Sequence, residues 1–185
     1  MSKIFILLMV FISSLATPVG AHANAADMVI LLNDICMNTD ADLSSVEKIV
    51  IGRGGINMPK ESKIYGAALS GFLLDYAKKT YLIEVAKEGS CSIISMDKIN
   101  SKQIVEILQK NYFLSEPTTG FSDATGDKIS TIWKVISRPQ WKVTSPPQSG
   151  AILLRVGKKE SESGVDANVV LTFITARMLN GIIGR

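Results

Sequence analysis

Nucleophilic catalysis is the first chemistry that the residue types of this chain could support. Two serine–lysine pairs have the S-x-x-K spacing of penicillin-recognising enzymes: Ser45 with Lys48, and Ser95 with Lys98. The partner motifs of those enzymes occur only as faint echoes in the wrong order, and the chain is far too short for that fold. A pattern with two fixed positions arises by chance in a chain rich in serine and lysine. We therefore interpret both pairs as chance matches.

Two carboxylates could instead hydrolyse a glycosidic bond, one as the acid and the other as the nucleophile or base. The chain has 17 aspartates and glutamates, and no spacing selects a pair among them. A small histidine-free hydrolase of glycans or peptides, working through carboxylates or a Ser–Lys pair, is therefore kept as an alternative. Whether the protein is an enzyme stays open, and the sequence favours that it is not.

Among metal sites, a calcium site is the one whose ligand spacing this sequence matches most nearly. Asn38, Asp40 and Asp42 have the 1, 3, 5 spacing of an EF-hand loop, but Leu43 replaces the glycine and Ile49 the bidentate glutamate. We interpret these residues as an acidic cluster at the start of a helix, and we predict no metal site. The sequence also has no complete glycine-rich nucleotide motif, so no cofactor is predicted.

Residues 1–23 have the pattern of a secretory signal peptide. Lys3 precedes an apolar run over residues 4–12, and an A-x-A cleavage site ends at Ala23. Cleavage is expected after Ala23, with Ala25 as the second choice. An uncleaved transmembrane anchor is the alternative, but it would need about 20 apolar residues.

Residues 24–185 are expected to form a single α+β domain that is periplasmic or secreted and has no stable transmembrane anchor. Removal of Lys3 changes the formal net charge from +3 to +2, and removal of His22 leaves no histidine. The remaining lysines and arginines do not cluster with aromatic residues. Nucleic acid is therefore not expected to be a partner.

Apolar residues at helical spacing predict helices over residues 27–38, 42–52 and 99–113. Asp42 or Ser44 is expected to cap the second helix, and Asn100 the third. The fold class that follows is α+β, with two or three N-terminal helices packed on a mainly antiparallel β-sheet that carries one disulfide.

The rest of the chain is expected to form strands joined by turns rich in glycine, proline and serine. Strands are predicted at 71–76, 81–96 (a hairpin), 129–137, 140–144, 151–156 and 167–178, with a loop over 115–128. The strand at 71–76 would join the hairpin as a three-stranded meander, and a helix over residues 64–77 is the alternative for this piece. Arg155 and Arg177 interrupt apolar strands, and we place them on the solvated face of the sheet.

The hairpin over residues 81–96 is expected to have a three-residue loop with Gly89 in the left-handed conformation, and a two-residue loop that places Cys91 opposite Ala86 is the alternative. With the three-residue loop, Val85 pairs with Cys91, and Cys91 lies on the core face. A slip of one residue would place Glu84 on the face of the cysteine, so this register is preferred.

The two cysteines, Cys36 and Cys91, are both expected to face the core, one from the first helix and one from the hairpin. In an exported domain, such a pair predicts a disulfide. Two free buried thiols are the alternative.

With no catalytic set in view, the leading hypothesis is a non-enzymatic exported module that binds an unidentified envelope or secreted protein. Trp141, between Pro139 and the Pro146-Pro147 pair, is a candidate anchor for that protein, although core packing is the commoner fate of a strand tryptophan. Phe121, in the loop over residues 115–128, is the second candidate.

A cysteine on the first helix, the corner GRGG and the strand SCSII together resemble an uncharacterised family of small secreted or periplasmic proteins of Gram-negative bacteria. The resemblance covers residues 27–113. It implies one cysteine pair and an address outside the cytoplasm, and it implies no activity.

Overall fold

The computed structural model describes most of the chain between Gly20 and Ile183. The described residues are 20–59, 68–87, 89–95, 97, 99–118, 121–122, 128–137, 150–156 and 169–183. Residues 1–19, the predicted strand at 140–144 and Trp141 lie outside them. The described part has an α+β fold, with an antiparallel sheet, several helices and one disulfide.

The helical segments of the described part are α1 (Gly20–Leu31), η1 (Leu32–Met37), α2 (Leu43–Gly52), α3 (Ser101–Asn111) and α4 (Ala176–Ile183). The strands are β1 (Ile56–Asn57), β2 (Ala68–Tyr76), β3 (Lys79–Ala86), β4 (Ser90–Ser95), β5 (Phe113–Leu114), β6 (Phe121–Ser122), β7 (Lys128–Ser137), β8 (Gly150–Val156) and β9 (Val169–Ile174).

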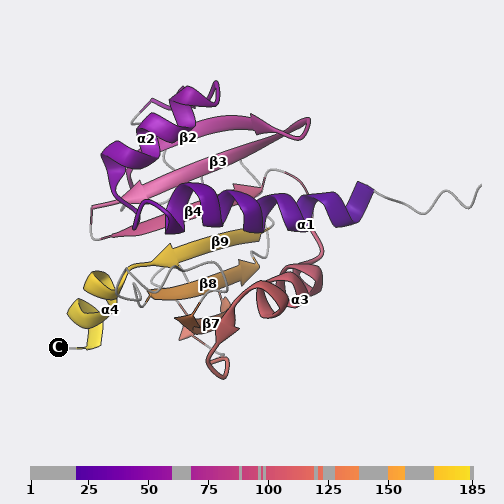
Figure 1. Cartoon of the computed structure of the whole chain (residues 1–185), viewed down its shortest axis with the longest axis vertical. Coiled ribbons are helices and arrows are strands. Elements are labelled where there is room, and N and C mark those ends of the chain that lie inside the picture. Colours follow the sequence, from indigo (N-terminus) through magenta and orange to yellow (C-terminus); the bar gives the residue numbers. More distant parts are fainter. Residues whose placement is uncertain are drawn as a thin grey trace, which may run out of the picture.

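The nine strands of the described residues belong to one sheet, in the order β1-β2-β3-β4-β9-β8-β7-β5, and β6 also pairs with β7. The strands β2, β3 and β4 follow one another in space as they do in sequence, which confirms the predicted three-stranded meander. Strand β9 lies between β4 and β8 and joins the two halves of the sheet (Figure 1).

The hairpin of β3 and β4 has the predicted register. Val85 pairs with Cys91 and Ala86 with Ser90, and Gly89 has a φ of +98° in the turn between them. Only glycine adopts this conformation without strain. Cys91 therefore faces the core, as the sequence indicates.

The first helix differs from its prediction over residues 27–38, because it begins at Gly20 and changes to a π-helix after Leu31. A backbone hydrogen bond from Asn38 N to Asn33 O, 3.0 Å long, shows the i to i+5 spacing. The wider turn brings successive residues to the core side, and Ile35 and Cys36 are both fully buried. No helix in the described part of the chain is long and apolar enough to cross a membrane.

Cys36 and Cys91 form the predicted disulfide. Their Cα atoms are 5.3 Å apart, and both residues are fully buried. The bond fixes the π-helical turn to the middle of the sheet, because β4 pairs with β3 on one side and with β9 on the other.

The second helix, α2, has Asp42 as its N-cap, as one of the two sequence alternatives predicts. The carboxylate of Asp42 accepts hydrogen bonds from Ser44 Oγ (2.7 Å) and from Ser45 N (2.9 Å). These bonds favour the ionised form and lower the pKa of Asp42. At the other end of α2, Arg53 forms an ion pair of 3.1 Å with Asp34 of η1.

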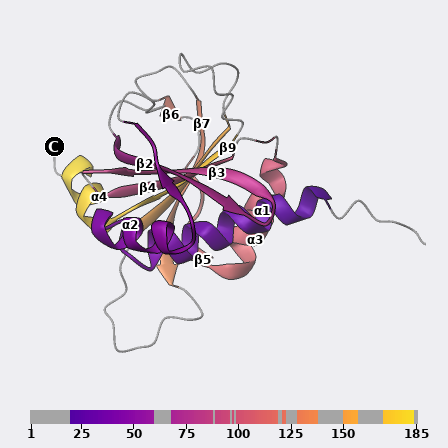
Figure 2. The same cartoon turned by 90° about the horizontal axis from the view of Figure 1, so that it is seen from above.

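The sheet buries side chains on both faces. The helices α1, α2 and α3 lie on one side of it (Figure 2). On that side, one cluster joins the helices to alternate residues of the strands, such as Phe72, Ile83 and Phe173. A smaller cluster, centred on Leu82, Ile94 and Val170, lies on the opposite face.

The opposite face also buries polar groups, which alternation alone does not predict. Glu84 is kept off the face of Cys91, as expected, but it is only 5% exposed. Beside it, Ser92 Oγ and Thr172 Oγ1 are 2.9 Å apart. Arg155 of β8 also lies on this face and is half-buried, so it is less solvated than the sequence indicates.

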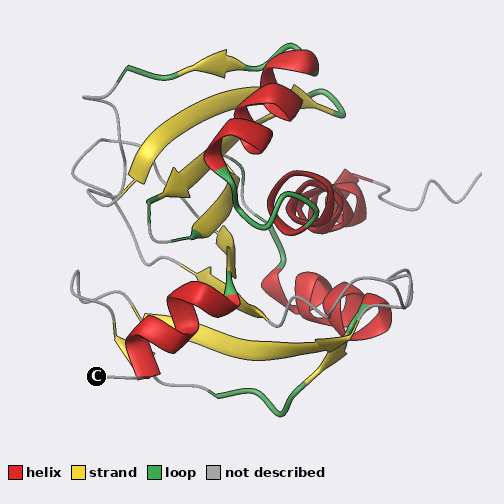
Figure 3. Cartoon of the chain, turned by 60° about the vertical axis from the view of Figure 1, so that its left-hand side comes forward, coloured by secondary structure: helices red, strands yellow, loops and turns green. Residues whose placement is uncertain are grey.

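The C-terminal prediction was wrong, because the expected strand at 167–178 ends at Ile174 and a helix follows. Thr175 caps α4, its Oγ1 accepting a hydrogen bond from Met178 N at 3.4 Å. Arg177 is therefore an exposed helix residue and not a strand residue. Figure 3 shows α4 after the last strand, at the C-terminal end.

Candidate functional site

A groove between the end of α3 and strand β7 is the best-formed candidate site in the described part of the chain. Its volume is about 560 Å³, which falls within the range of about 300 to 1,000 Å³ that is usual for ligand sites. We call it the α3–β7 groove. Its lining residues are Gln109, Tyr112, Phe113, Leu114, Ser115, Glu116, Pro117 and Trp133.

The groove exists because α3 ends earlier than its sequence pattern predicts. Asn100 is the N-cap, as predicted, but Tyr112 already has an extended backbone, and β5 begins at Phe113. Ser115 N then donates to Lys134 O at 2.9 Å, and Thr118 pairs with Ile132. The segment after the helix therefore follows β7, and it opens a hollow between itself and α3.

The predicted loop over residues 115–128 is thus partly a strand edge. Its middle contains β6, and the backbone of Phe121 pairs with that of Ile129 in β7. Short, irregular pairing of this kind is common at the edges of sheets, and such short edges limit uncontrolled strand addition.

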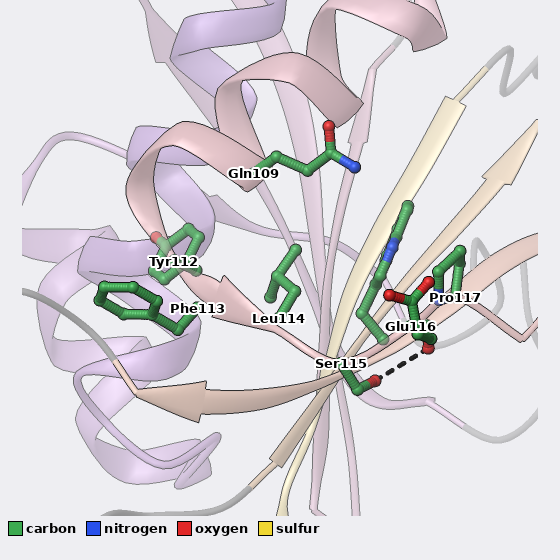
Figure 4. A pocket seen from close by; sticks show the side chains of 8 residues that line it. Gln109, Tyr112, Phe113, Leu114, Ser115, Glu116 and Pro117 are labelled. Atoms are coloured by element: carbon green, nitrogen blue, oxygen red, sulfur yellow. Dashed lines mark hydrogen bonds between the residues drawn. The ribbon is translucent and has the colours of Figure 1, made fainter.

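The apolar lining of the groove ranges from buried to exposed. Trp133 and Tyr112 are 2% and 7% exposed, whereas Phe113 is 63% exposed. Figure 4 shows Leu114 between Phe113 on one side and Glu116 on the other. Trp133 Nε1 is buried and has no hydrogen-bond acceptor within the described structure. The lining of the groove therefore contains two buried aromatic side chains and one aromatic side chain that is exposed to solvent.

The polar groups of the groove are few. Ser115 Oγ is occupied, since it donates to Glu116 O (3.0 Å) and accepts from Lys134 N (2.9 Å). Glu116 is exposed. Among the lining residues that the structure describes it is the only charged one, and no described cation forms an ion pair with it. The amide of Gln109 projects from α3 (Figure 4). An apolar hollow with a few polar groups is typical of a binding site.

A second polar group lies in the core, where α1 meets β3. Tyr81 Oη donates to Asp27 Oδ2 at 3.4 Å, and both residues are buried. Burial raises the pKa of Asp27 above its ordinary value of 3.8, and the Tyr81 hydroxyl and the Lys79 charge only partly oppose this. Burial and the Asp27 charge also raise the pKa of Tyr81. Lys79 itself pairs with Asp97 at 2.9 Å.

Asp27 should make the stability of the protein depend on pH. Because its pKa is raised by folding, its favourable contribution is fully present below pH 3.8 and is lost as the pH rises through the raised value. Asp27→Asn cannot ionise and keeps an acceptor for Tyr81. We expect the variant to gain unfolding free energy relative to the wild type as the pH rises from about 3 to 7. Urea titrations across that range measure the difference, and a difference that stays constant with pH would contradict the assignment.

The described residues of the S-x-x-K pairs and of the acidic cluster do not line the groove. The Ser95 hydroxyl donates to Asp97 O at 3.0 Å and is 2% exposed, while Lys98 lies outside the described residues. Asp42 serves as a helix cap. In the described part of the chain, no three His, Cys, Asp or Glu residues are grouped as a metal site would require.

Sequence reasoning missed the α3–β7 groove. Trp133 was included only in a predicted strand, and Tyr112 only in a predicted helix face. The signal that could have indicated the site is the presence of three apolar residues just after the last helical turn: Phe113, Leu114 and Pro117. Such a run of apolar residues at the end of a helix is uncommon in a plain solvent loop.

Comparison of the chain with family models, with curated proteins and with solved structures finds no match.

Proposed function

We propose that this chain is an exported, disulfide-stabilised binding module that holds a short segment of another envelope or secreted protein in the α3–β7 groove. The observation that carries the proposal is the groove itself, whose lining combines two buried aromatic residues with the exposed Phe113. Rigid aromatic side chains with an exposed rim are typical of interaction hot spots.

A buried disulfide supports the address outside the cytoplasm, because such bonds are typical of oxidising compartments.

The position of α1 bears on the choice between the two expected cleavage sites. Helix α1 begins at Gly20, so a cut after Ala23 would remove only its first four residues. Ala25 is fully buried, and this favours the cut after Ala23 over the cut after Ala25. Residues 24–185 would then form the mature domain, with its N-terminal helices covering the sheet.

The hydrolase alternative receives less support from the groove. A glycosidase of the usual kind needs two carboxyl groups on either side of the bond that is cleaved. Glu116 is the only carboxylate among the eight lining residues. Binding is therefore the function that this geometry favours.

Phe113→Ala should weaken binding in the groove without unfolding the protein. Peptides would first be selected from a random library on the purified wild-type domain, and their affinities would then be measured by calorimetry. We expect Phe113→Ala to weaken the selected peptides by about tenfold or more, because it removes an exposed aromatic anchor. Its cost in stability should be less than about 1 kcal/mol, as is usual at an exposed site.

Ile56→Ala is the matched control, since Ile56 is 61% exposed and lies in β1 at the other edge of the sheet. It removes a similarly exposed apolar side chain and should leave the affinities unchanged. If the selected peptides bind the wild type and Phe113→Ala with equal affinity, their binding site must lie elsewhere on the protein. A library that enriches no peptide would count against the proposal as a whole.

A further inference from the structure

We propose that the α3–β7 groove selects a positively charged side chain of the bound segment, and that arginine is the side chain it fits best. This inference rests on the proposed function, since it names the chemistry of the residue that enters the groove.

The charge of the groove points to a cation. Glu116 is the only charged residue among the described residues of the lining, and no cation in that part of the chain forms an ion pair with it. Two lysines are close in sequence but do not line the groove. Lys110 follows Gln109 on α3, and alternation along β7 places the side chain of Lys134 on the opposite face of the sheet from Trp133. The negative charge of Glu116 is therefore available to a ligand.

The apolar part of the groove fits the stem of a long basic side chain. Arginine and lysine both carry a hydrocarbon stem that packs on apolar surface while the charged head reaches a polar partner. Leu114 and Pro117 offer such a surface, since both line the groove together with Glu116.

Two features favour arginine over lysine. The guanidinium is planar and stacks on aromatic rings, whereas the ammonium of lysine is a compact and strongly hydrated charge. Its five N–H groups can also reach two acceptors at once. The two oxygens of the Glu116 carboxylate, which lines the groove, can accept such a bidentate pair.

The test compares two probes that differ in charge and hardly in shape: Nα-acetylarginine N-methylamide and Nα-acetylcitrulline N-methylamide. Citrulline replaces one nitrogen of the guanidinium with oxygen and is neutral. Dissociation constants would come from NMR titration of the full mature domain, followed through the amide signals of Phe113 to Glu116. We expect the arginine probe to bind about five- to tenfold more tightly than the citrulline probe.

Glu116→Gln should abolish most of that preference, because it keeps the shape of the side chain and removes its charge. Glu106→Gln is the matched control, since Glu106 is an exposed residue of α3 that does not line the groove. It should retain the preference. Raising the salt concentration from about 20 to about 500 mM should weaken the arginine probe and leave the citrulline probe unchanged.

The outcomes separate this inference from the proposed function. If both probes bind the wild type equally, or if Glu116→Gln keeps the preference, the groove is a binding site but the selection of a cation is wrong. If neither probe shifts the groove signals and no library peptide binds, the proposed function fails as well. Butylguanidinium is a further probe. If it binds as tightly as the arginine probe, a small free cation rather than a protein segment is the ligand, and the peptide part of the inference is wrong.

Discussion

Replacing both Cys36 and Cys91 with alanine is expected to lower the free energy of unfolding by about 2 to 5 kcal/mol. The two residues are 55 positions apart, and for a loop of that length the chain-entropy model gives about 4 kcal/mol. A typical domain is stable by only about 5 to 15 kcal/mol. Urea unfolding of the oxidised wild type and of the double variant at pH 7 measures the loss.

Wild-type protein that is reduced before unfolding provides the control for this substitution. Reduction breaks the S–S bond and leaves the other side chains unchanged. The reduced protein should therefore lose about as much unfolding free energy as the double variant. If the variant stays within about 1 kcal/mol of the oxidised wild type, the disulfide contributes little to the stability of the fold. In that event, packing alone would hold the π-helical turn on β4.

Phe173→Ala should be the most damaging single truncation in the core, with a loss of about 3 to 5 kcal/mol. Phe173 is fully buried on β9, between Cys91 of β4 and Ile152 of β8 in the sheet register. Its ring also packs directly over Gly150, where a Cβ would contact the ring and lie 2.7 Å from Ile174 O. Removing the ring therefore leaves a cavity that a neighbouring side chain cannot readily fill.

Phe113→Ala makes the same chemical change at a position that is 63% exposed, and it is therefore the control for Phe173→Ala. It should cost less than about 1 kcal/mol. Thermal and urea unfolding of the two variants would be compared in the same buffer. Similar losses for both would mean that Phe113 is packed in solution, and it would then no longer be available as a binding residue.

Local sequence rules predicted the hairpin of β3 and β4 down to its register. The turn requires a positive φ, which Gly89 supplies, and a slip of one residue would have moved Glu84 to the face of Cys91. The caps Asp42 and Asn100 are likewise local, because each bonds to a backbone N–H only two or three residues away. The disulfide followed from these local assignments and from the expected compartment.

The C-terminal helix was missed because β9 gives no signal of where it ends. All six of its residues are buried, so its apolar run lacks the alternation that marks a half-covered strand. Thr175 has a high strand propensity and also caps α4 through its hydroxyl. The apolar residues of α4 therefore appeared to continue the strand.

The α3–β7 groove could not be derived from the sequence, because it depends on contacts between distant segments. Trp133 lies 16 or more positions from every other lining residue, and it joins them only because the chain after Leu114 pairs with β7. Phe121, which was chosen as an anchor, lies in a short strand that pairs with β7, and its role as an anchor stays a prediction. Whether Trp141 binds a partner stays a prediction.

The central position of β9 also decides when the sheet can be completed during synthesis. Strands β4 and β8 do not pair with each other, and each bonds to β9, with Ser92 and Thr172 80 positions apart. Until residues 169–174 have emerged, a growing chain can form only two partial sheets, each with an open edge. Pairing over so long a sequence distance is slow. Completion of the sheet must therefore wait until β9 has been synthesised.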